Sequence, residues 1–274
     1  MHTTMRKLLL LASLSGLLLS SCGGVDTYLK NKDANVRLTK ANEYYEKRTW
    51  YKANELYASL IPVVRGTKNH EELQYRYAYS FYNMKDYLSS SYQFRTFVDN
   101  FPSSKRAEEC EFMYAVSLFK DAPKFTLDQS STVKAMAALY TFTSLYKDSK
   151  FTAEANKYLD ICREKLEQKE AGAAKLYFDM DQYKAAIVAY KSALDEYPDS
   201  ENADYYQYMI IRSSYHYATH SRPDKQEERF AEVVSAFNML KEQYPQSTFI
   251  KNAEGLHADA TVKINKLRKN NEHN

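Results

Sequence analysis

Apolar residues along this chain follow two spacings that recur in the same order. In the first, a small residue is followed three positions later by an aromatic or large apolar one, and the first three examples lie 37 residues apart. These pairs are Ala41/Tyr44, Ala78/Phe81, Ala115/Leu118, Ala174/Tyr177 and Ser214/Tyr217. Residues three apart lie on one side of a helix, so each pair predicts a helix whose small residue permits close packing.

The second spacing follows each pair and joins a small or apolar residue to large or apolar residues four and seven positions later. It occurs as Ala53/Tyr57/Leu60, Ser90/Phe94/Phe97, Ala135/Leu139/Phe142, Ala186/Tyr190/Ala193 and Val233/Phe237/Leu240. Positions i, i+4 and i+7 also share one helix face, so a second helix is expected after each first one.

Four of the second helices are expected to end alike. Their final stretches are Phe101-Pro102-Ser103-Ser104, Tyr146-Lys147-Asp148-Ser149, Tyr197-Pro198-Asp199-Ser200 and Tyr244-Pro245-Gln246-Ser247. Proline does not continue a helix, and the Ser or Asp that follows is expected to cap the next helix. Arg65 and Lys147 stand where the other repeats have proline. Longer loops are expected within two helix pairs, at Asp121–Gln129 and Thr219–Glu227.

Composition supports an all-α protein, because only six glycines and six prolines occur in 274 residues and no alternating strand-like runs are present. The pattern resembles the tetratricopeptide repeat, whose helix pairs stack into an α-solenoid. About five helix pairs are expected, with a C-terminal capping helix and a polar tail. The pairs are placed at about 38–65, 70–102, 105–147, 152–198 and 201–245, the cap at 249–267 and the tail at 268–274. A helical bundle with the same stripes in its core is the alternative.

The N-terminus has the features of an export signal. Arg6 and Lys7 precede an apolar run from Leu8 to Leu19, which is shorter than the roughly 18 apolar residues that a membrane-spanning helix needs. The run ends in Leu19-Ser20-Ser21-Cys22, which resembles the lipobox of bacterial lipoproteins. That resemblance implies a signal peptide at 1–21, acylation of Cys22, as with palmitate, and a flexible tether at 22–36. An ordinary cleaved signal with a chance cysteine is the alternative.

Charge and cysteine content exclude several classes of function. Removal of residues 1–21 leaves 36 basic residues against 35 acidic ones, a balance that argues against a nucleic-acid-binding protein. Cys110 and Cys162 lie in helical patterns with different offsets, so two buried thiols are expected rather than a disulfide. His216 and His220 have the i, i+4 spacing of a metal pair but lack a third ligand nearby. No phosphate-binding glycine loop or nucleophile motif is found, so neither enzymatic activity nor a cofactor is expected.

Three further segments combine with the lipobox, the tether and the five repeats. They are Asp128-Gln129 before a helix, Gly172-Ala173-Ala174 before Lys175-Leu176-Tyr177, and the charged segment Ser221–Arg229, expected to be a loop. Together these features resemble the BamD family of lipoproteins in the outer-membrane β-barrel assembly (BAM) machinery. The resemblance implies a lipid-anchored location in the outer membrane, facing the periplasm, and a scaffold role. Its partners would be the BamA-type barrel-forming subunit, other assembly-complex subunits and unfolded outer-membrane β-barrel proteins. A periplasmic envelope or cell-division scaffold and a surface glycan-binding lipoprotein are the alternatives.

A peptide-binding groove is expected along the first helices of the repeats. Positions one past the small residue and one past the large residue should face inward, and the residues one turn earlier should extend the same line. The candidates are Asn42, Tyr45, Tyr75, Tyr79, Tyr82, Phe112 and Phe119, with Val116 between the last two. The alternative for each is packing within its own repeat. The C-terminal repeats are expected to have fewer inward aromatic residues, and their Arg222 and Arg229 are candidates for docking the barrel-forming subunit.

Overall fold

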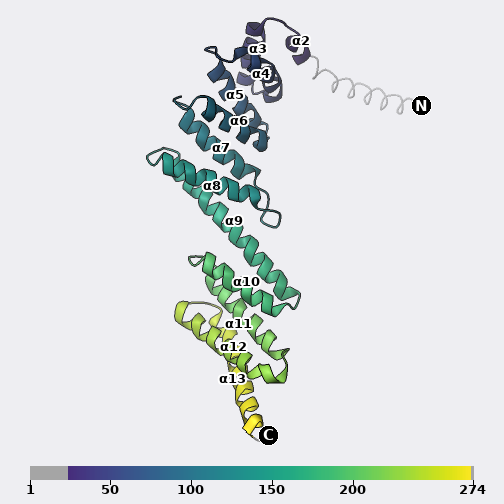
Figure 1. Ribbon diagram of the computed structural model, residues 1–274, viewed down its shortest axis with the longest axis vertical. Helices are drawn as coiled ribbons and strands as arrows, with labels where there is room; N and C mark the ends of the chain where they lie inside the picture. Colours follow the sequence, from purple (N-terminus) through teal and green to yellow (C-terminus); the bar gives the residue numbers. More distant parts are fainter. Residues whose placement is uncertain (1–23, 273–274) are drawn as a thin grey trace, which may run out of the picture. The chain divides into compact units, whose positions relative to one another are not determined.

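The computed structural model describes residues 24–272, which form twelve helices (Figure 1). The prediction of an all-α repeat protein is confirmed, and no helix among the described residues is long and apolar enough to cross a membrane. The helices are α2 (Val25–Leu29), α3 (Ala34–Glu46), α4 (Trp50–Val64), α5 (His70–Asn83), α6 (Tyr87–Asn100), α7 (Ala107–Asp121), α8 (Ser130–Leu145), α9 (Thr152–Asp179), α10 (Tyr183–Glu196), α11 (Ala203–Thr219), α12 (Pro223–Gln243) and α13 (Ile250–Glu272).

The chain divides into two compact units. Unit 1 comprises the chain up to Pro123 together with Gln129–Cys162, and unit 2 comprises Lys124–Asp128 together with the chain from Arg163 onward. The boundary between the units therefore falls within α9. Inside each unit, helices that follow one another in sequence pack against each other (Figure 1).

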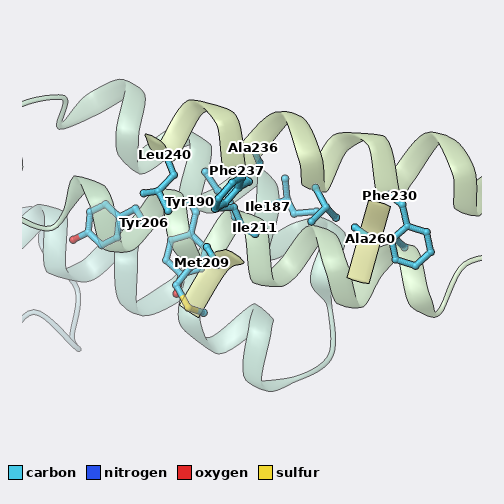
Figure 2. Close-up of a cluster of buried hydrophobic side chains, with 14 of the residues drawn as sticks. Ile187, Tyr190, Tyr206, Met209, Ile211, Phe230, Ala236, Phe237, Leu240 and Ala260 are labelled. Atoms are coloured by element: carbon cyan, nitrogen blue, oxygen red, sulfur yellow. The ribbon is translucent and has the colours of Figure 1, made fainter. Parts of the chain in front are cut away.

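The small residues of the repeat pattern lie in the helix contacts. Ala41, Ala78, Ala115, Ala174 and Ser214 are all buried, at 3% exposure or less. The second-helix pattern is equally buried, and Figure 2 shows Tyr190, Phe237 and Leu240 from it in the core of unit 2. Tyr177 is an exception, because it remains 44% exposed although it was expected to fill space between helices. The spacing of small and large residues thus describes most of the helix packing.

Three of the helix pairs share one tight turn. Arg48, Lys85 and Asp181 adopt a left-handed backbone conformation, with φ of 56°, 63° and 59°. Each stands seven residues after the small residue of its first helix. The next residue donates its N–H to a carbonyl in the last turn of that helix, as in Asp86 to Phe81 at 3.1 Å. Such a bond satisfies a carbonyl that the helix end leaves open.

The serines after the second helices join successive repeats. Ser104, Ser149 and Ser200 donate to the carboxylates of Glu71, Glu108 and Glu167, at 2.7, 2.5 and 2.5 Å. Each carboxylate belongs to the first helix of the preceding repeat, 33 to 41 residues back. The expectation that these serines cap the next helix is wrong for Ser104 before α7 and for Ser200 before α11.

The residues at the cap positions of α7 and α11 are Arg106 and Asn202 instead. Ser104 and Ser200 lie two residues earlier and accept the N–H of Arg106 and Asn202. A serine hydroxyl at this position can accept a backbone N–H of the turn and at the same time donate to a carboxylate of the preceding repeat. This double role explains why the turn ends in serine.

Three expected boundaries differ in the structure. The described part of the expected tether, from Gly24, contains α2 and the start of α3, and Val25 is 6% exposed within the core of unit 1. Burial of that apolar side chain holds the segment on the repeats. The expected polar tail is helical as far as Glu272, since no glycine or proline interrupts α13 after Leu267.

The third difference concerns the expected loop Thr219–Glu227. Helix α12 begins at Pro223, so only residues 220–222 connect it to α11. Proline is favourable at the first helical position, where its missing N–H is not needed, and Asp224 complements the helix dipole in the first turn. By contrast, the expected loop between α7 and α8 is present at residues 122–129.

Both cysteines outside the N-terminal segment are buried. Cys110 is a free thiol, and burial raises its pKa well above the ordinary value. Cys162 is also buried, at 0% exposure. The expectation of two buried cysteine side chains is confirmed.

Replacement of Ala186 by leucine should overpack a helix contact. Ala186 on α10 is fully buried, and extra methyl groups in a filled site force neighbours from their preferred rotamers. We expect Ala186→Leu to lower the free energy of unfolding by roughly 1–3 kcal/mol in urea titrations. Val188→Leu is the matched control on the same helix, because Val188 is 62% exposed. Equal stabilities of the two variants would show that Ala186 does not lie in a tight contact.

Candidate peptide-binding faces

Tyrosine rings lie on two of the first helices of unit 1, in a row on α5 and singly on α3. On α5 the ring of Tyr79 lies 4.8 Å from that of Tyr75 and 6.4 Å from that of Tyr82, measured between centroids. On α3 the ring of Tyr45 packs edge-on against Trp50 at 5.1 Å. All four tyrosines are half-buried, so each presents part of its ring to solvent and is held by the rest.

One carboxylate orients two of these tyrosines. The hydroxyl groups of Tyr75 and Tyr79 both donate to Oε1 of Glu109 on α7, the first at 2.8 Å. Burial raises the pKa of both hydroxyls, and the bond to Glu109 raises it further. Both tyrosines therefore remain protonated donors. The buried side chain of Phe94 also holds Tyr79 in place, since the centroids of the two rings lie 4.9 Å apart.

An ion-pair network crosses the same face. Arg76 on α5 pairs with Glu46 of α3 at 2.6 Å and with Glu72 at 2.5 Å. Glu72 in turn pairs with Arg106, which precedes α7, at 2.5 Å. Both guanidinium groups also lie over tyrosine rings, Arg76 over Tyr45 at 5.0 Å and Arg106 over Tyr75 at 4.3 Å. Every cation in this network is thus matched by a carboxylate.

The network lowers the pKa of Glu72. Burial by itself pushes this pKa upward, but the hydrogen bonds from Arg76 and Arg106 outweigh burial and leave the pKa below its ordinary value. A carboxylate that accepts from two guanidinium groups is stabilised in its charged form.

Two residues expected to face inward lie in the core instead. Phe112 is 4% exposed and stacks on Phe151 at 4.7 Å, because the start of α9 covers it. Val116 on the same helix is 2% exposed. These side chains therefore stabilise the contact of α7 with its neighbours and do not line a groove.

The remaining candidates lie at the surface of unit 1. Asn42 accepts a hydrogen bond from the hydroxyl of Tyr57 at 2.9 Å, and both side chains of this pair come from the first repeat. Phe119 is half-buried, with its ring 4.4 Å from that of Tyr158. The face expected from the sequence thus keeps Asn42, Tyr45, Tyr75, Tyr79, Tyr82 and Phe119.

Unit 2 carries a second aromatic face that the sequence reasoning missed. Arg212 of α11 lies over Phe178 of α9 at 4.8 Å and over Tyr208 at 5.8 Å. Tyr208 stacks on Phe249 at 5.1 Å, and His216 stacks on Tyr183 at 4.9 Å. The C-terminal repeats, in which fewer inward aromatic residues were expected, thus also carry clustered aromatic side chains. A stripe on α11 at positions 205, 208, 212 and 215 was the available signal.

The two candidate docking arginines lie at the start of α12. Arg222 is exposed and pairs with Asp224 at 3.0 Å. The guanidinium of Arg229 lies over the ring of Tyr217 at 4.0 Å and donates to the hydroxyl of Ser221. Because α12 begins at Pro223, these residues occupy a helix start and not the charged loop that was expected.

A groove of about 470 Å³ lies between α10, α11 and α12. Its apolar wall includes Leu194, Ile210 and Met239, and its rim includes Lys191 and Glu232. Met239 is 49% exposed, so an apolar side chain faces solvent there. Among residues 24–272, no group of three or more His, Cys, Asp or Glu side chains could hold a metal ion.

Comparison with known proteins places the chain in a family. The YfiO family model, described as "Outer membrane lipoprotein", matches residues 30–201 and 176–268. The chain belongs to the YfiO family of outer membrane lipoproteins. A protein of Aquifex aeolicus (strain VF5), provisionally named outer membrane protein assembly factor BamD, is 29% identical over 143 residues. The match covers 52% of this chain and 47% of that protein, so the chain spans about half the length of this curated relative.

Two solved structures of yeast proteins are also similar. The TPR2AB-domain:pHSP90 complex of Sti1 matches 83% of this chain and 98% of the solved chain, at 13% identity and a TM-score of 0.37. The histone chaperone Hif1, a scaffold protein, matches 73% of this chain and 95% of the solved chain, at 12% identity and a TM-score of 0.28. Likenesses of this size do not bear on the fold, which the helices themselves establish.

The family match confirms the resemblance to BamD-type lipoproteins. It begins at residue 30, and it covers both the tyrosine face of unit 1 and the Arg212 face of unit 2. The expected signal peptide 1–21 and Cys22 lie outside the described residues.

Glu72 should stabilise the YfiO-family fold more at neutral pH than in acid. Because its pKa is lowered in the folded protein, its contribution is present above the ordinary carboxyl pKa and is lost as the pH falls through the lowered value. The side chain is 41% exposed, so screening keeps the effect of Glu72→Gln near 0.5–1 kcal/mol at pH 7, and smaller near pH 3.

Urea unfolding of Glu72→Gln at the two pH values measures this difference. Glu55→Gln is the control, since Glu55 belongs to the same unit and has no ion pair within the described part of the chain. An equal loss of stability for Glu72→Gln at both pH values would contradict the linkage.

Proposed function

We propose that this protein is a lipid-anchored scaffold subunit of the outer-membrane β-barrel assembly complex. In this role it binds the BamA-type barrel-forming subunit and receives unfolded outer-membrane β-barrel proteins. The row of half-buried tyrosine rings on the first helices of unit 1, in a chain of this family, is the observation that carries the proposal. The role is that of a binding scaffold without catalysis.

The tyrosine face suits an extended peptide that carries apolar side chains. Ring faces offer apolar contact area at low conformational cost, and hydroxyl groups at the edges can bond a peptide backbone. Glu109 and Phe94 already hold Tyr79 in place, so little side-chain freedom remains to be lost on binding. Tyr82 extends the row toward Tyr87, whose ring lies 5.6 Å away.

The C-terminal repeats suit a lasting contact with a folded subunit. The groove between α10, α11 and α12 combines apolar walls with a charged rim, the usual composition of an interface. Arg222 and Arg229 at the start of α12 supply further polar contacts. We assign the BamA-type subunit to this region and the membrane anchor to Cys22.

Loss of two tyrosines from unit 1 should weaken peptide capture. We expect Tyr79→Ala with Tyr82→Ala to lower the affinity for a β-barrel-protein peptide roughly thirtyfold, since an aromatic anchor contributes about 2 kcal/mol. Fluorescence titration measures the affinity, and a pull-down of the BamA-type subunit from detergent extracts should be unchanged.

Two further variants make that result specific. Tyr82→Ala alone spares the contact of Tyr79 with Phe94 and separates binding from stability. Tyr140→Ala on α8 is the control, because Tyr140 is 52% exposed on a second helix. Normal peptide binding by the double variant, or loss of the subunit in its place, would refute this division of roles.

Replacement of Cys22 should release the protein from membranes. Without the thiol that carries the acyl chains, Cys22→Ala is expected in the soluble fraction or as an uncleaved precursor, because two or more chains are needed for stable anchoring. Ser21→Ala keeps a small residue before Cys22 and is the control. Mass spectrometry that finds an unmodified Cys22 N-terminus in the wild-type protein would rule out the lipid anchor.

A further inference from the structure

The Arg212 platform is defined here as Phe178, Tyr208 and Arg212, with Tyr183 and His216 beside them. Arg212 is half-buried, and its guanidinium lies over two aromatic rings. Its guanidinium also lies 3.6 Å from Sδ of Met209. In the part of the chain that the structure describes, no carboxylate lies within 4.0 Å of this guanidinium.

The repeat pattern provides an internal reference for Arg212. Arg212 stands two positions before the small residue Ser214, and Arg76 of unit 1 stands two positions before the small residue Ala78. Each guanidinium group also lies over an aromatic ring on the first helix of the preceding repeat. In both cases that aromatic residue stands four positions after the small residue of its helix, Ala41 or Ala174. The distances are 5.0 Å from Arg76 to Tyr45 and 4.8 Å from Arg212 to Phe178. The two arginines therefore occupy one repeat position with one geometry.

The carboxylates that neutralise Arg76 have no counterpart at Arg212. Glu72, four residues before Arg76, is replaced by Tyr208. Glu46 corresponds to Asp179, but the carboxylate of Asp179 pairs with Lys175 of its own helix. At this repeat position the arginine of unit 1 is therefore paired with carboxylates, whereas Arg212 of unit 2 has no ion pair among the described residues.

Other acidic groups near the platform are also engaged. Asp181 accepts a hydrogen bond from the hydroxyl of Tyr183 at 2.5 Å. Asp259 accepts from Tyr215 at 2.5 Å and pairs with Lys263 at 3.6 Å. A guanidinium held on apolar rings is only partly hydrated, so an incoming carboxylate can form two parallel hydrogen bonds with it at a reduced desolvation cost.

Aromatic surface continues on both sides of Arg212. Tyr208 leads to Phe249 on one side, and Phe178 leads to Tyr183 and His216 on the other. A ligand whose chain continues in both directions fits this arrangement better than a terminal group does. The rings would cover the side chains next to the carboxylate.

We propose that the Arg212 platform binds an extended polypeptide segment in which an Asp or Glu side chain lies next to an aromatic residue. The carboxylate pairs with Arg212, and the neighbouring ring packs on Tyr208 or Phe178. We assign the segment to an unfolded β-barrel protein, an assignment that rests on the proposed function. The selectivity for a carboxylate rests only on the contrast between Arg212 and Arg76.

The test uses the full-length lipoprotein in detergent and two synthetic peptides with blocked ends. The peptides differ only in one residue, so that one contains Asp-Phe and the other Asn-Phe at its centre. We expect the wild-type protein to bind the Asp peptide about tenfold more tightly, because a charge-assisted bidentate pair is stronger than its neutral counterpart. Arg212→Gln should abolish this preference.

Two more variants keep the result interpretable. Tyr208→Glu places at Arg212 the carboxylate that unit 1 has as Glu72, so it should also abolish the preference without removing the arginine. Arg163→Gln, which removes an exposed cation paired with Asp199 at 3.7 Å, should keep it. Thermal unfolding of each variant checks that the fold is retained.

The two proposals can fail separately. Equal wild-type affinity for both peptides, or an Asp preference that survives in Arg212→Gln or Tyr208→Glu, would overturn the Arg212 site. The effect of Tyr79→Ala with Tyr82→Ala tests the proposed function independently, since these residues belong to unit 1.

Discussion

Contact between paired helices at a fully buried small residue is the constraint on which the structure depends. Ala41, Ala78 and Ala115 leave room for the large second-helix residues, such as Tyr57 and Phe94, which are buried completely. Because each pair buries only part of its apolar surface, it needs the next pair to cover the rest. The turn serines complete that dependence by bonding to a carboxylate of the preceding repeat.

This packing leaves the first helices free to carry binding chemistry. The buried side of each first helix packs on the second helix of its pair. Side chains on a neighbouring, partly exposed side contact the first helix of an adjacent repeat, as Tyr75 of α5 contacts Glu109 of α7. In unit 1 this surface stripe holds tyrosines whose hydroxyl groups donate to Glu109. It also holds Arg76, whose charge is paired with Glu46 and Glu72. A surface with its charges already paired favours apolar peptide contacts, whereas the unpaired Arg212 of unit 2 favours an anionic one.

Sequence reasoning located most of the unit 1 face but not its limits. Tyr45, Tyr75, Tyr79 and Tyr82 are at the surface as expected, since one-turn spacing along a helix is a local property. Phe112 follows the same spacing yet is buried, because Tyr158 of α9 and Phe151, which directly precedes α9, stack over it. Covering residues from another helix leave no trace in the periodicity of α7 itself.

The sequence by itself determined the helix pairs, the buried small residues and the family, because each follows from spacing or from similarity along the chain. Only the tertiary structure decided which polar groups are satisfied. Glu167, for example, accepts from Ser200 and Tyr206, which lie 33 and 39 residues away in sequence. Likewise Arg76 and Arg212 occupy the same repeat position, but on the preceding first helix Glu46 pairs with Arg76, whereas Asp179 pairs with Lys175 of its own helix. The physical reason is that helix formation depends on neighbours within one or two turns, whereas charge pairing depends on neighbours in space.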